Sequence, residues 1–292
     1  MDILPLGLIL IAAFLHAFWN YAAKGADEPQ AMLQAALWAS LIIFAPAFAY
    51  RLPSAKFAPG AWLFILATGV LHSLYFYALG RAYRSGDLSR VYPLARGSAP
   101  VLVVGIAALF LGERISPTGG LAIFLVVSGI LVSHFDPAGR AGWLSLLREK
   151  ESGARWALAT GLVTAAYSVV DKAGVARVSP DVYIYFMFIL TALFNLPLQL
   201  TRGRASFAGL PLSETRFLFR AAAAGFCMMG AYGLVLFAMQ LSKVSYVVAA
   251  REVSVIIGSA LGVFVLKEGG ARQKLAGASL VAAGLVLLAI SK

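Results

Sequence analysis

Two arginines stand at matching positions inside long apolar runs of this sequence. Arg96 is followed by Glu113 and Arg251 by Glu268, each 17 residues further along (96 to 113 and 251 to 268). A guanidinium in apolar surroundings can bind a carboxylate through two parallel hydrogen bonds, which predicts contact with a substrate carboxylate. A structural ion pair, or a side chain that extends to the membrane interface, explains the same residues. Glu252 is the acidic candidate: it can pair with Arg96, meet a substrate amine or carry a coupling proton.

Histidines and aromatic residues form a second group of candidates in the apolar runs. His16 and Asn20 share one face of a predicted helix because they are four residues apart. His72 and Tyr75 share a face of another helix. The predicted binding residues of this group are His16, Trp19, Asn20, His72, Tyr75, Tyr77, Tyr92 and Tyr167. Such a wall of aromatic and hydrogen-bonding groups suits an amphipathic zwitterion, and hydrogen bonding between helices is the alternative interpretation.

Asp171 and Lys172 stand near the end of an apolar run at 156–175. A charged pair at such a place is typical of a helix end at the membrane interface, which is one interpretation of both residues and the favoured one for Lys172. Asp171 has a polar counterpart, Asn20, near the matching end of the first apolar run.

The runs that carry these residues are too apolar for a soluble protein. Of the 292 residues, 61% are hydrophobic and 13% are charged, whereas a soluble domain has about 25% charged residues. The mean hydropathy is +0.84. Because about 20 apolar residues cross a bilayer, the sequence predicts an all-α integral membrane protein with ten transmembrane helices. The expected spans are 3–23, 31–50, 61–83, 90–111, 117–135, 156–175, 182–200, 217–240, 244–266 and 273–290.

The composition also argues against several other classes of protein. The formal net charge of +11 is interpreted as loop cations that set orientation and meet anionic lipid headgroups, with no nucleic-acid partner expected. Cys227 is the single cysteine, and the three histidines form no cluster with metal-ligand spacing. We therefore expect no metal site and no cofactor. The sequence holds no constellation of nucleophile, acid and base on one face, so no catalytic residue is assigned and the protein is not expected to be an enzyme.

The two halves of the chain are predicted to be repeats of one another. The stretch 101–111 overlays 256–266 at the offset of 155 that relates Arg96 to Arg251. We expect a first five-span repeat at 1–137, a linker at 138–155 and a second repeat at 156–292. Five is an odd number of spans, so the second repeat enters the membrane from the opposite side. The repeats are then inverted around a central cavity, with the substrate site at their interface.

Small residues and a proline give expectations about how the helices pack and bend. The glycines and serine at 119–120, 128–129, 277 and 284 are predicted to let helices of the two halves approach closely, with a dimer contact as the alternative. The functional unit is expected to be a monomer or a homodimer. Pro93 and Gly97, on either side of Arg96, predict a bend in the span at 90–111. No proline precedes Arg251 in the matching span, so no such bend is expected there.

Lysine and arginine concentrate in the loops after the odd-numbered spans. Lys24, Arg81, Arg84, Arg140 and Lys267 are examples. The positive-inside rule places these loops in the cytoplasm. Both termini are therefore predicted to be periplasmic, in a multi-pass protein of the bacterial inner membrane with lipid as its surrounding partner.

Several stretches of the sequence resemble one known family. These are 77–90, the Ala-Pro-Val of 99–101 and the Phe-Leu-Gly-Glu-Arg-Ile-Ser of 110–116, with looser versions at 241–246 and 264–268. They resemble the EamA-type proteins of the drug/metabolite transporter superfamily. The resemblance implies ten spans in two inverted repeats, and bacterial amino-acid exporters, including an aromatic amino-acid exporter, are among its members. Many members carry a Glu-Pro pair where this chain has Ala99-Pro100 and Ser254-Val255, so a mechanism that uses that glutamate is not carried over.

These observations predict a secondary transporter that exports amino acids, aromatic ones among them, or related small metabolites by alternating access. The alternative is an efflux carrier for cationic drugs or for a nucleotide or lipid-linked sugar. A cationic cargo requires buried carboxylates, whereas the charged residues of the spans favour arginine. The charged residues of the spans therefore favour a small-molecule substrate that bears a carboxylate.

Overall fold

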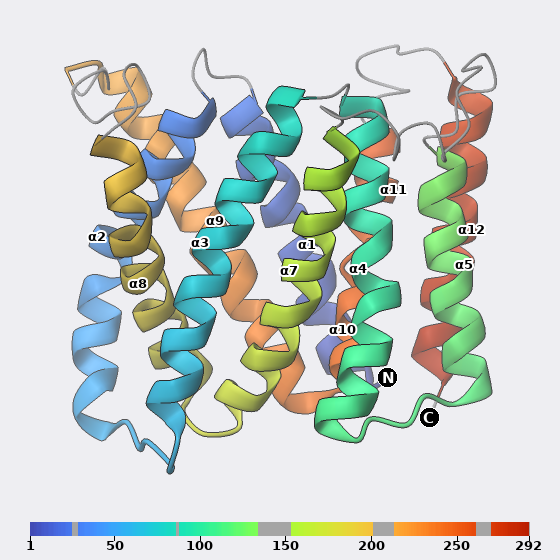
Figure 1. Ribbon diagram of the computed structural model, residues 1–292, viewed down its shortest axis with the longest axis horizontal. Helices are drawn as coiled ribbons and strands as arrows, with labels where there is room; N and C mark the ends of the chain where they lie inside the picture. Colours follow the sequence, from blue (N-terminus) through green and yellow to red (C-terminus); the bar gives the residue numbers. More distant parts are fainter. Residues whose placement is uncertain (25–28, 86–87, 134–152, 201–212, 261–269, 292) are drawn as a thin grey trace.

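The computed structural model describes residues 1–24, 29–85, 88–133, 153–200, 213–260 and 270–291. Within these ranges the chain is helical and contains no strand. The helices stand side by side and run along a common direction, and the N- and C-termini lie at the same end of the bundle (Figure 1). The predicted linker at 138–155 falls largely outside the described residues.

The helices of the first half match the apolar runs closely. They are α1 (Ile3–Lys24), α2 (Pro29–Arg51), α3 (Ala61–Ser85), α4 (Leu88–Leu111) and α5 (Pro117–Ser133), with a short 3-10 helix, η1, at Leu52–Ser54. The second half contains α7 (Gly153–Val175), α8 (Pro180–Leu200), α9 (Thr215–Leu241), α10 (Val244–Ala250), α11 (Val253–Ala260) and α12 (Ala271–Ile290). Each predicted span therefore coincides with one helix, with a single exception described below.

Length and composition make this a multi-pass membrane protein. Five of the described helical stretches are long and apolar enough to cross a bilayer, namely Met32–Ser54, Ala61–Leu79, Pro180–Pro197, Thr215–Leu241 and Ala271–Ile290. Three shorter apolar stretches are Ile3–Trp19, Ala95–Leu111 and Pro117–Ser133. Large apolar side chains such as Leu109 and Phe110 face outward and are 83% and 77% exposed, as expected where lipid is the solvent. The total of ten spans stays a prediction.

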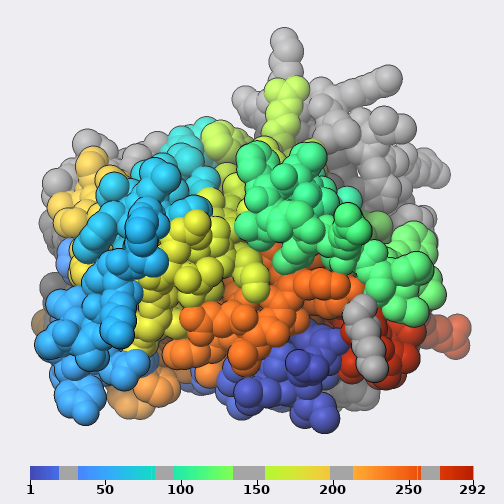
Figure 2. Space-filling view, turned by 90° about the horizontal axis from the view of Figure 1, so that it is seen from below, coloured from blue at the N-terminus to red at the C-terminus, as the bar shows by residue number. Residues whose placement is uncertain are grey.

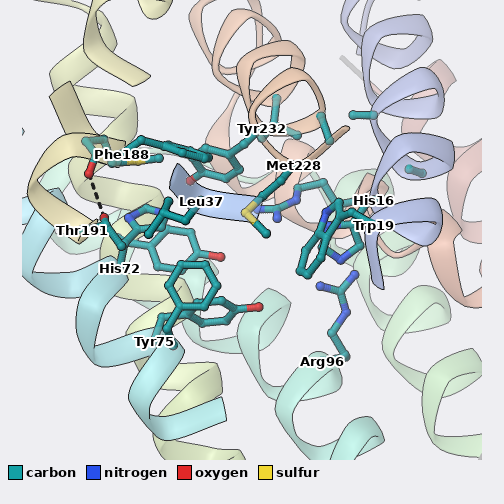
Figure 3. A pocket seen from close by; sticks show the side chains of 18 residues that line it. His16, Trp19, Leu37, His72, Tyr75, Arg96, Phe188, Thr191, Met228 and Tyr232 are labelled. Atoms are coloured by element: carbon teal, nitrogen blue, oxygen red, sulfur yellow. Dashed lines mark hydrogen bonds between the residues drawn. The ribbon is translucent and has the colours of Figure 1, made fainter. Parts of the chain in front are cut away.

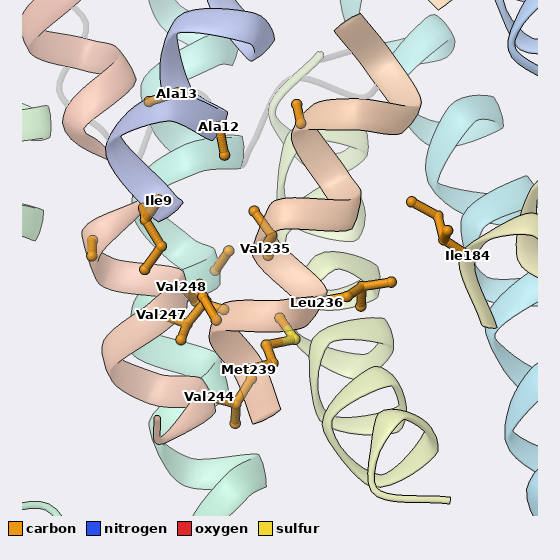
Figure 4. Close-up of a cluster of buried hydrophobic side chains, with 14 of the residues drawn as sticks. Ile9, Ala12, Ala13, Ile184, Val235, Leu236, Met239, Val244, Val247 and Val248 are labelled. Atoms are coloured by element: carbon orange, nitrogen blue, oxygen red, sulfur yellow. The ribbon is translucent and has the colours of Figure 1, made fainter. Parts of the chain in front are cut away.

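The two halves interlock through pairs of helices. α5 packs on α12, α1 and α2 pack on α9, and α3 and α4 pack on α7, so each of these contacts joins one half to the other. A buried apolar cluster joins α1, α9 and α10 through residues such as Ile9, Val235 and Val247 (Figure 4). At the end that carries the termini, segments from both halves lie against one another across the face (Figure 2).

The contact between α5 and α12 depends on glycine, as the sequence predicts. A Cβ atom at Gly129 would lie 2.8 Å from the backbone nitrogen of Val281, and one at Gly284 would lie 2.7 Å from the carbonyl oxygen of Ala122. A Cβ atom at Gly277 would collide with Ser133 and with the backbone of Gly129. The two helices therefore touch backbone to backbone, and the prediction that these glycines serve packing between the halves is confirmed.

The span predicted as one helix over 244–266 is interrupted. α10 ends at Ala250, Arg251 and Glu252 form a turn, and α11 begins at Val253. The amide of Glu252 donates to the carbonyl of Ala249 and the amide of Ser254 to that of Arg251, at 3.1 and 3.3 Å, so the chain tightens to three-residue spacing. By contrast, α4 is helical throughout, including Pro93 and Gly97. The predicted bend at Pro93 and Gly97 stays a prediction, whereas the interruption at Arg251 was not predicted.

Candidate functional site

A cavity lies between the two halves, near the interrupted helix. Its walls come from α1, α2, α3, α4, α7, α8 and α9 and from the turn at Arg251. The lining combines aromatic and apolar side chains with a few polar ones (Figure 3), which is the usual composition of a small-molecule site. Its volume is about 60 Å³, enough for a few water molecules. A larger cargo requires the walls to separate.

Arg96 of α4 reaches across the interface between the halves. Its Nε lies 3.2 Å from Oε2 of Glu252, and its Nη2 donates to Oγ of Ser254 at 2.9 Å. The side chains of Arg96 and Glu252 are 16% and 4% exposed. The predicted pairing of Glu252 with Arg96 is confirmed. Because both charges are largely removed from water, each depends on the other for its stability.

Arg251 has different surroundings from Arg96. Its guanidinium carbon lies 5.3 Å from the centre of the Tyr232 ring, within the range in which a cation is attracted to an aromatic face. Arg251 lines the central cavity and also a smaller adjoining one of about 30 Å³. The smaller cavity is also lined by Arg96 and Glu252, so the three charges lie around one connected space.

Four aromatic rings of the cavity pack as a group, and Tyr232, which contacts Arg251, is one of them. His72 lies 4.2 Å from Tyr167 and 5.2 Å from Tyr232, and Tyr75 lies 5.7 Å from Tyr167, between ring centres. Nδ1 of His72 lies 3.0 Å from the carbonyl oxygen of Thr68. The hydroxyl oxygen of Thr68 is also 3.0 Å from Nδ1, so Nδ1 donates to the carbonyl in one tautomer of His72 and accepts from the hydroxyl in the other. On the far side, His16 meets Trp19 edge-on at 4.9 Å, and Arg96 points toward both in Figure 3.

Asp171 of α7 is buried just behind this wall. It is 0% exposed. The hydroxyl of Tyr183 donates to its Oδ1 at 2.8 Å, and the hydroxyl of Tyr232 donates to its Oδ2. The interface assignment of Asp171 is therefore wrong. A carboxylate inside an apolar run was the available signal, because such residues face the interior of a helix bundle.

Lys172, which follows Asp171 in the sequence, lies against the end of α9. Its Nζ donates to the carbonyl oxygen of Ser242 at 2.9 Å and to that of Met239. These carbonyls end α9, where a cation is favourable because the last carbonyls of a helix lack partners and carry its negative dipole end.

Further polar contacts join the two halves at the end of the bundle that carries the termini. Glu113, which follows α4, accepts the amide of Val244 at 2.7 Å and the hydroxyl of Ser245 at 2.8 Å. It thus caps the first turn of α10 from the other half. Lys243 donates to the carbonyl of Arg114 at 3.0 Å, and the amide of Ala58 donates to the carbonyl of Arg177 at 2.9 Å.

Most of the sequence-predicted binding residues meet at the two cavities. His16, Trp19, His72, Tyr75, Arg96, Tyr167 and Arg251 line the larger one, and Glu252 lines the smaller. Tyr77 lies elsewhere, with its ring 5.6 Å from that of Trp156. The side chains of Asn20 and Tyr92 fall outside the described part of the structure. Tyr232, Met228 and Phe188 also line the cavity and were not predicted, since nothing distinguishes them from packing residues of an apolar helix.

Comparison with known proteins gives two positive findings. The sequence profile of the EamA-like transporter family matches the chain twice, at residues 3–135 and 151–290. Twenty-eight chains of solved structures also match. One of them, described as "Crystal structure of protein", has a TM-score of 0.74 at 18% sequence identity, over 98% of this chain and 96% of that one. At that identity the likeness concerns the fold alone. No curated protein matches at a significant level.

Proposed function

The chain belongs to the EamA-like transporter family, and from this premise we propose that it exports amino acids, aromatic ones among them, or related small metabolites. The family belongs to the drug/metabolite transporter superfamily, so the protein is a membrane transporter. The proposal adds a cargo class, export across the bacterial inner membrane, and alternating access between ten spans in two inverted repeats. It also places both termini in the periplasm.

The observation that carries the cargo proposal is the charge pattern of the cavities. Arg96, Arg251 and Glu252 are the described lining residues that carry a formal charge. Two guanidinium groups beside one carboxylate match a zwitterion, whose carboxylate meets arginine and whose ammonium meets Glu252. The ring group around His72 and Tyr75 then faces the side chain of the cargo, and favours an apolar or aromatic one.

The ion pair between Arg96 and Glu252 gives a route for binding. The two side chains form an ion pair, with Nε of Arg96 3.2 Å from Oε2 of Glu252. A zwitterion that enters between them replaces one ion pair by two, so neither buried charge is left alone. A purely cationic cargo would leave Arg96 without an anion. A purely anionic cargo that displaced Glu252 from Arg96 would leave Glu252 without a cation. The exchange therefore selects for molecules that carry both charges.

Counterflow in proteoliposomes tests the proposal directly. Vesicles loaded with unlabelled phenylalanine or leucine are placed in a trace of the labelled amino acid, and uptake is compared with vesicles that lack protein. We expect uptake above that background and competition by unlabelled amino acids. If none of the twenty amino acids moves above the background, the cargo proposal fails. If tetraphenylphosphonium competes and amino acids do not, the cargo class is cationic drugs. If a nucleotide competes and amino acids do not, the cargo class is nucleotide-linked molecules.

Arginine variants then test the role of the cavity. Arg251→Ala is expected to raise the half-saturating concentration of the labelled amino acid. Arg81→Ala is the matched control, because Arg81 is exposed and lies over the Trp156 ring, away from both cavities. Equal half-saturation in the two variants would leave Arg251 a structural residue.

A further inference from the structure

Asp171 is a buried carboxyl group that the proposed binding of cargo does not use. It lies on α7, one turn from the end of that helix, and it is fully buried. Among the residues that the structure describes, its hydrogen-bond donors are two phenol hydroxyls, and it takes part in no ion pair. Neutral donors alone compensate a buried negative charge poorly.

The same carboxyl group is connected to the cavity by a single side chain. Tyr232 lines the cavity, and its hydroxyl donates to Oδ2 of Asp171. On the other oxygen, the Tyr183 hydroxyl is 2.8 Å from Oδ1 and 3.3 Å from the carbonyl of Phe64. Tyr183 is itself fully buried. Tyr232 therefore borders the cavity, whereas Tyr183 contacts the carboxyl group without lining the cavity.

We infer that Asp171 is the site at which this transporter binds and releases a proton, exchanged with the cavity through the hydroxyl of Tyr232. The inference rests on the proposed function as a transporter and adds the ion that accompanies transport. It is distinct from the Arg96–Glu252 pair, which contacts the cargo.

The transfer balances with groups that are present. A hydronium ion in the cavity gives its proton to Oη of Tyr232, and the hydroxyl hydrogen of Tyr232 moves to Oδ2 of Asp171. One O–H bond forms and one breaks at the tyrosine, which ends neutral with its new hydrogen directed to cavity water. Asp171 becomes a neutral acid whose Oδ2–H donates back to Tyr232, and Tyr183 continues to donate to Oδ1. No buried group loses its hydrogen bond in either state.

The groups that face this site link it to the cargo site. His72 on α3, Tyr167 on α7, Tyr183 on α8 and Tyr232 on α9 surround it, and Arg251 lies 5.3 Å from the centre of the Tyr232 ring. Tyr232 thus contacts both charges, Asp171 through its hydroxyl and Arg251 through its ring. Protonation of Asp171 removes a negative charge from one end of this side chain and so changes the electrostatic potential at Arg251.

Infrared difference spectroscopy tests the proton site without any cargo. Purified protein is titrated from about pH 9 to about pH 5, and the carbonyl band of a protonated carboxylic acid is followed. We expect a band in the wild type that is lost in Asp171→Asn and retained in Asp181→Asn. Asp181 is the matched control because it forms an ion pair with Arg51 at the surface. An Asp171→Asn spectrum identical to that of the wild type overturns the inference.

Transport gives the second readout. Asparagine has the shape of a protonated aspartate, so Asp171→Asn is expected to show one counterflow rate at every pH, equal to that of the wild type at low pH. Asp171→Glu should restore a pH-dependent rate, and Tyr232→Phe should slow proton exchange while the carboxylic-acid band persists. Wild-type pH dependence in Asp171→Asn refutes the assignment. Because the infrared titration needs no cargo, a failure of the amino-acid proposal is distinguishable from a failure of this one.

Discussion

The fourth span of the first half and its counterpart in the second half carry the same arginine in different structures. Arg96 sits in the unbroken helix α4 and is held by Glu252 and Ser254. Arg251 sits in a turn between α10 and α11 and lies over the ring of Tyr232. At the offset of 155, the first-half positions that correspond to Glu252 and Ser254 are Gly97 and Ala99.

The two arginines therefore have different partners, because the two halves differ in sequence at the positions that follow each arginine. Only the second half supplies the acidic and hydroxyl groups, and it supplies both to the arginine of the first half. The pair thereby ties the halves together across the cavity, whereas Arg251 is restrained by a weaker contact with an aromatic face. Arg251 is therefore the arginine more readily available to a cargo.

Removal of Glu252 is expected to have the largest effect, because it deprives Arg96 of its acidic partner. Glu252→Ala leaves the buried guanidinium of Arg96 without its carboxylate, and we expect the free energy of unfolding to fall by about 3–5 kcal/mol. Denaturation of the purified variant in detergent measures the loss. The double variant Arg96→Met with Glu252→Leu is the control, because replacement of both charges by apolar groups removes the unpaired ion. A Glu252→Ala protein as stable as the wild type contradicts a buried ion pair.

Replacement of Arg251 tests its availability to the cargo. A hydrogen bond between charged groups contributes about 1.5–3 kcal/mol, so Arg251→Ala should raise the half-saturating cargo concentration by about 10- to 100-fold. We expect Arg251→Lys to recover part of this loss, since it keeps the charge without the planar fork. Saturation curves of counterflow provide the measurement. The distinction drawn between the arginines is wrong if Arg96→Ala weakens half-saturation and Arg251→Ala leaves it unchanged.

Ser254 provides a milder test of the first arginine. Ser254→Ala removes the hydrogen bond that Nη2 of Arg96 donates to the second half and leaves Glu252 in place. We expect the free energy of unfolding to fall by about 1–2 kcal/mol, because the hydroxyl bonds to a charged group but Arg96 keeps its carboxylate. Denaturation beside Ser279→Ala measures the difference, since the exposed Ser279 bonds only to its own helix. Equal losses in both variants would show that the Arg96 contact adds nothing.

Tyr77 provides the smallest expected effect. Its ring packs on Trp156 and lines neither cavity, so Tyr77→Phe should leave half-saturation within about twofold of the wild type. Tyr75→Phe is the matched comparison, because Tyr75 lines both cavities. A larger change for Tyr77→Phe than for Tyr75→Phe in the same counterflow assay would reverse the placement of the two residues.

The helices were predictable from sequence because apolar run length alone determines which segments suit a bilayer. The bounds of α2 and α9 fall within a few residues of the predicted spans. The interruption at Arg251 was not predictable in this way, since no proline or glycine lies between Val244 and Ser254. Its position follows from tertiary contacts, in which Glu252 and Ser254 turn toward Arg96.

The candidate site was predictable to the extent that charge or hydrogen bonding distinguishes a residue from its apolar neighbours. Arg96, Arg251 and His72 are conspicuous inside apolar runs, and all three line the cavity. Asp171 was assigned to the interface because it lies close to the end of its run. Only the three-dimensional structure shows that Tyr183 and Tyr232 enclose it.

The glycine contact between α5 and α12 has a mechanical consequence. At Gly129, Gly277 and Gly284 the two helices approach so closely that backbone and side-chain atoms of one fill the space beside the other, and such close packing resists sliding of one helix past the other. The pair stands at one edge of the bundle, and α2 and α8 stand at the opposite edge (Figure 1). If one half rotates against the other about this contact, the displacement of each helix grows with its distance from the glycines. The helices α2 and α8 then move furthest, whereas α5 and α12 move least.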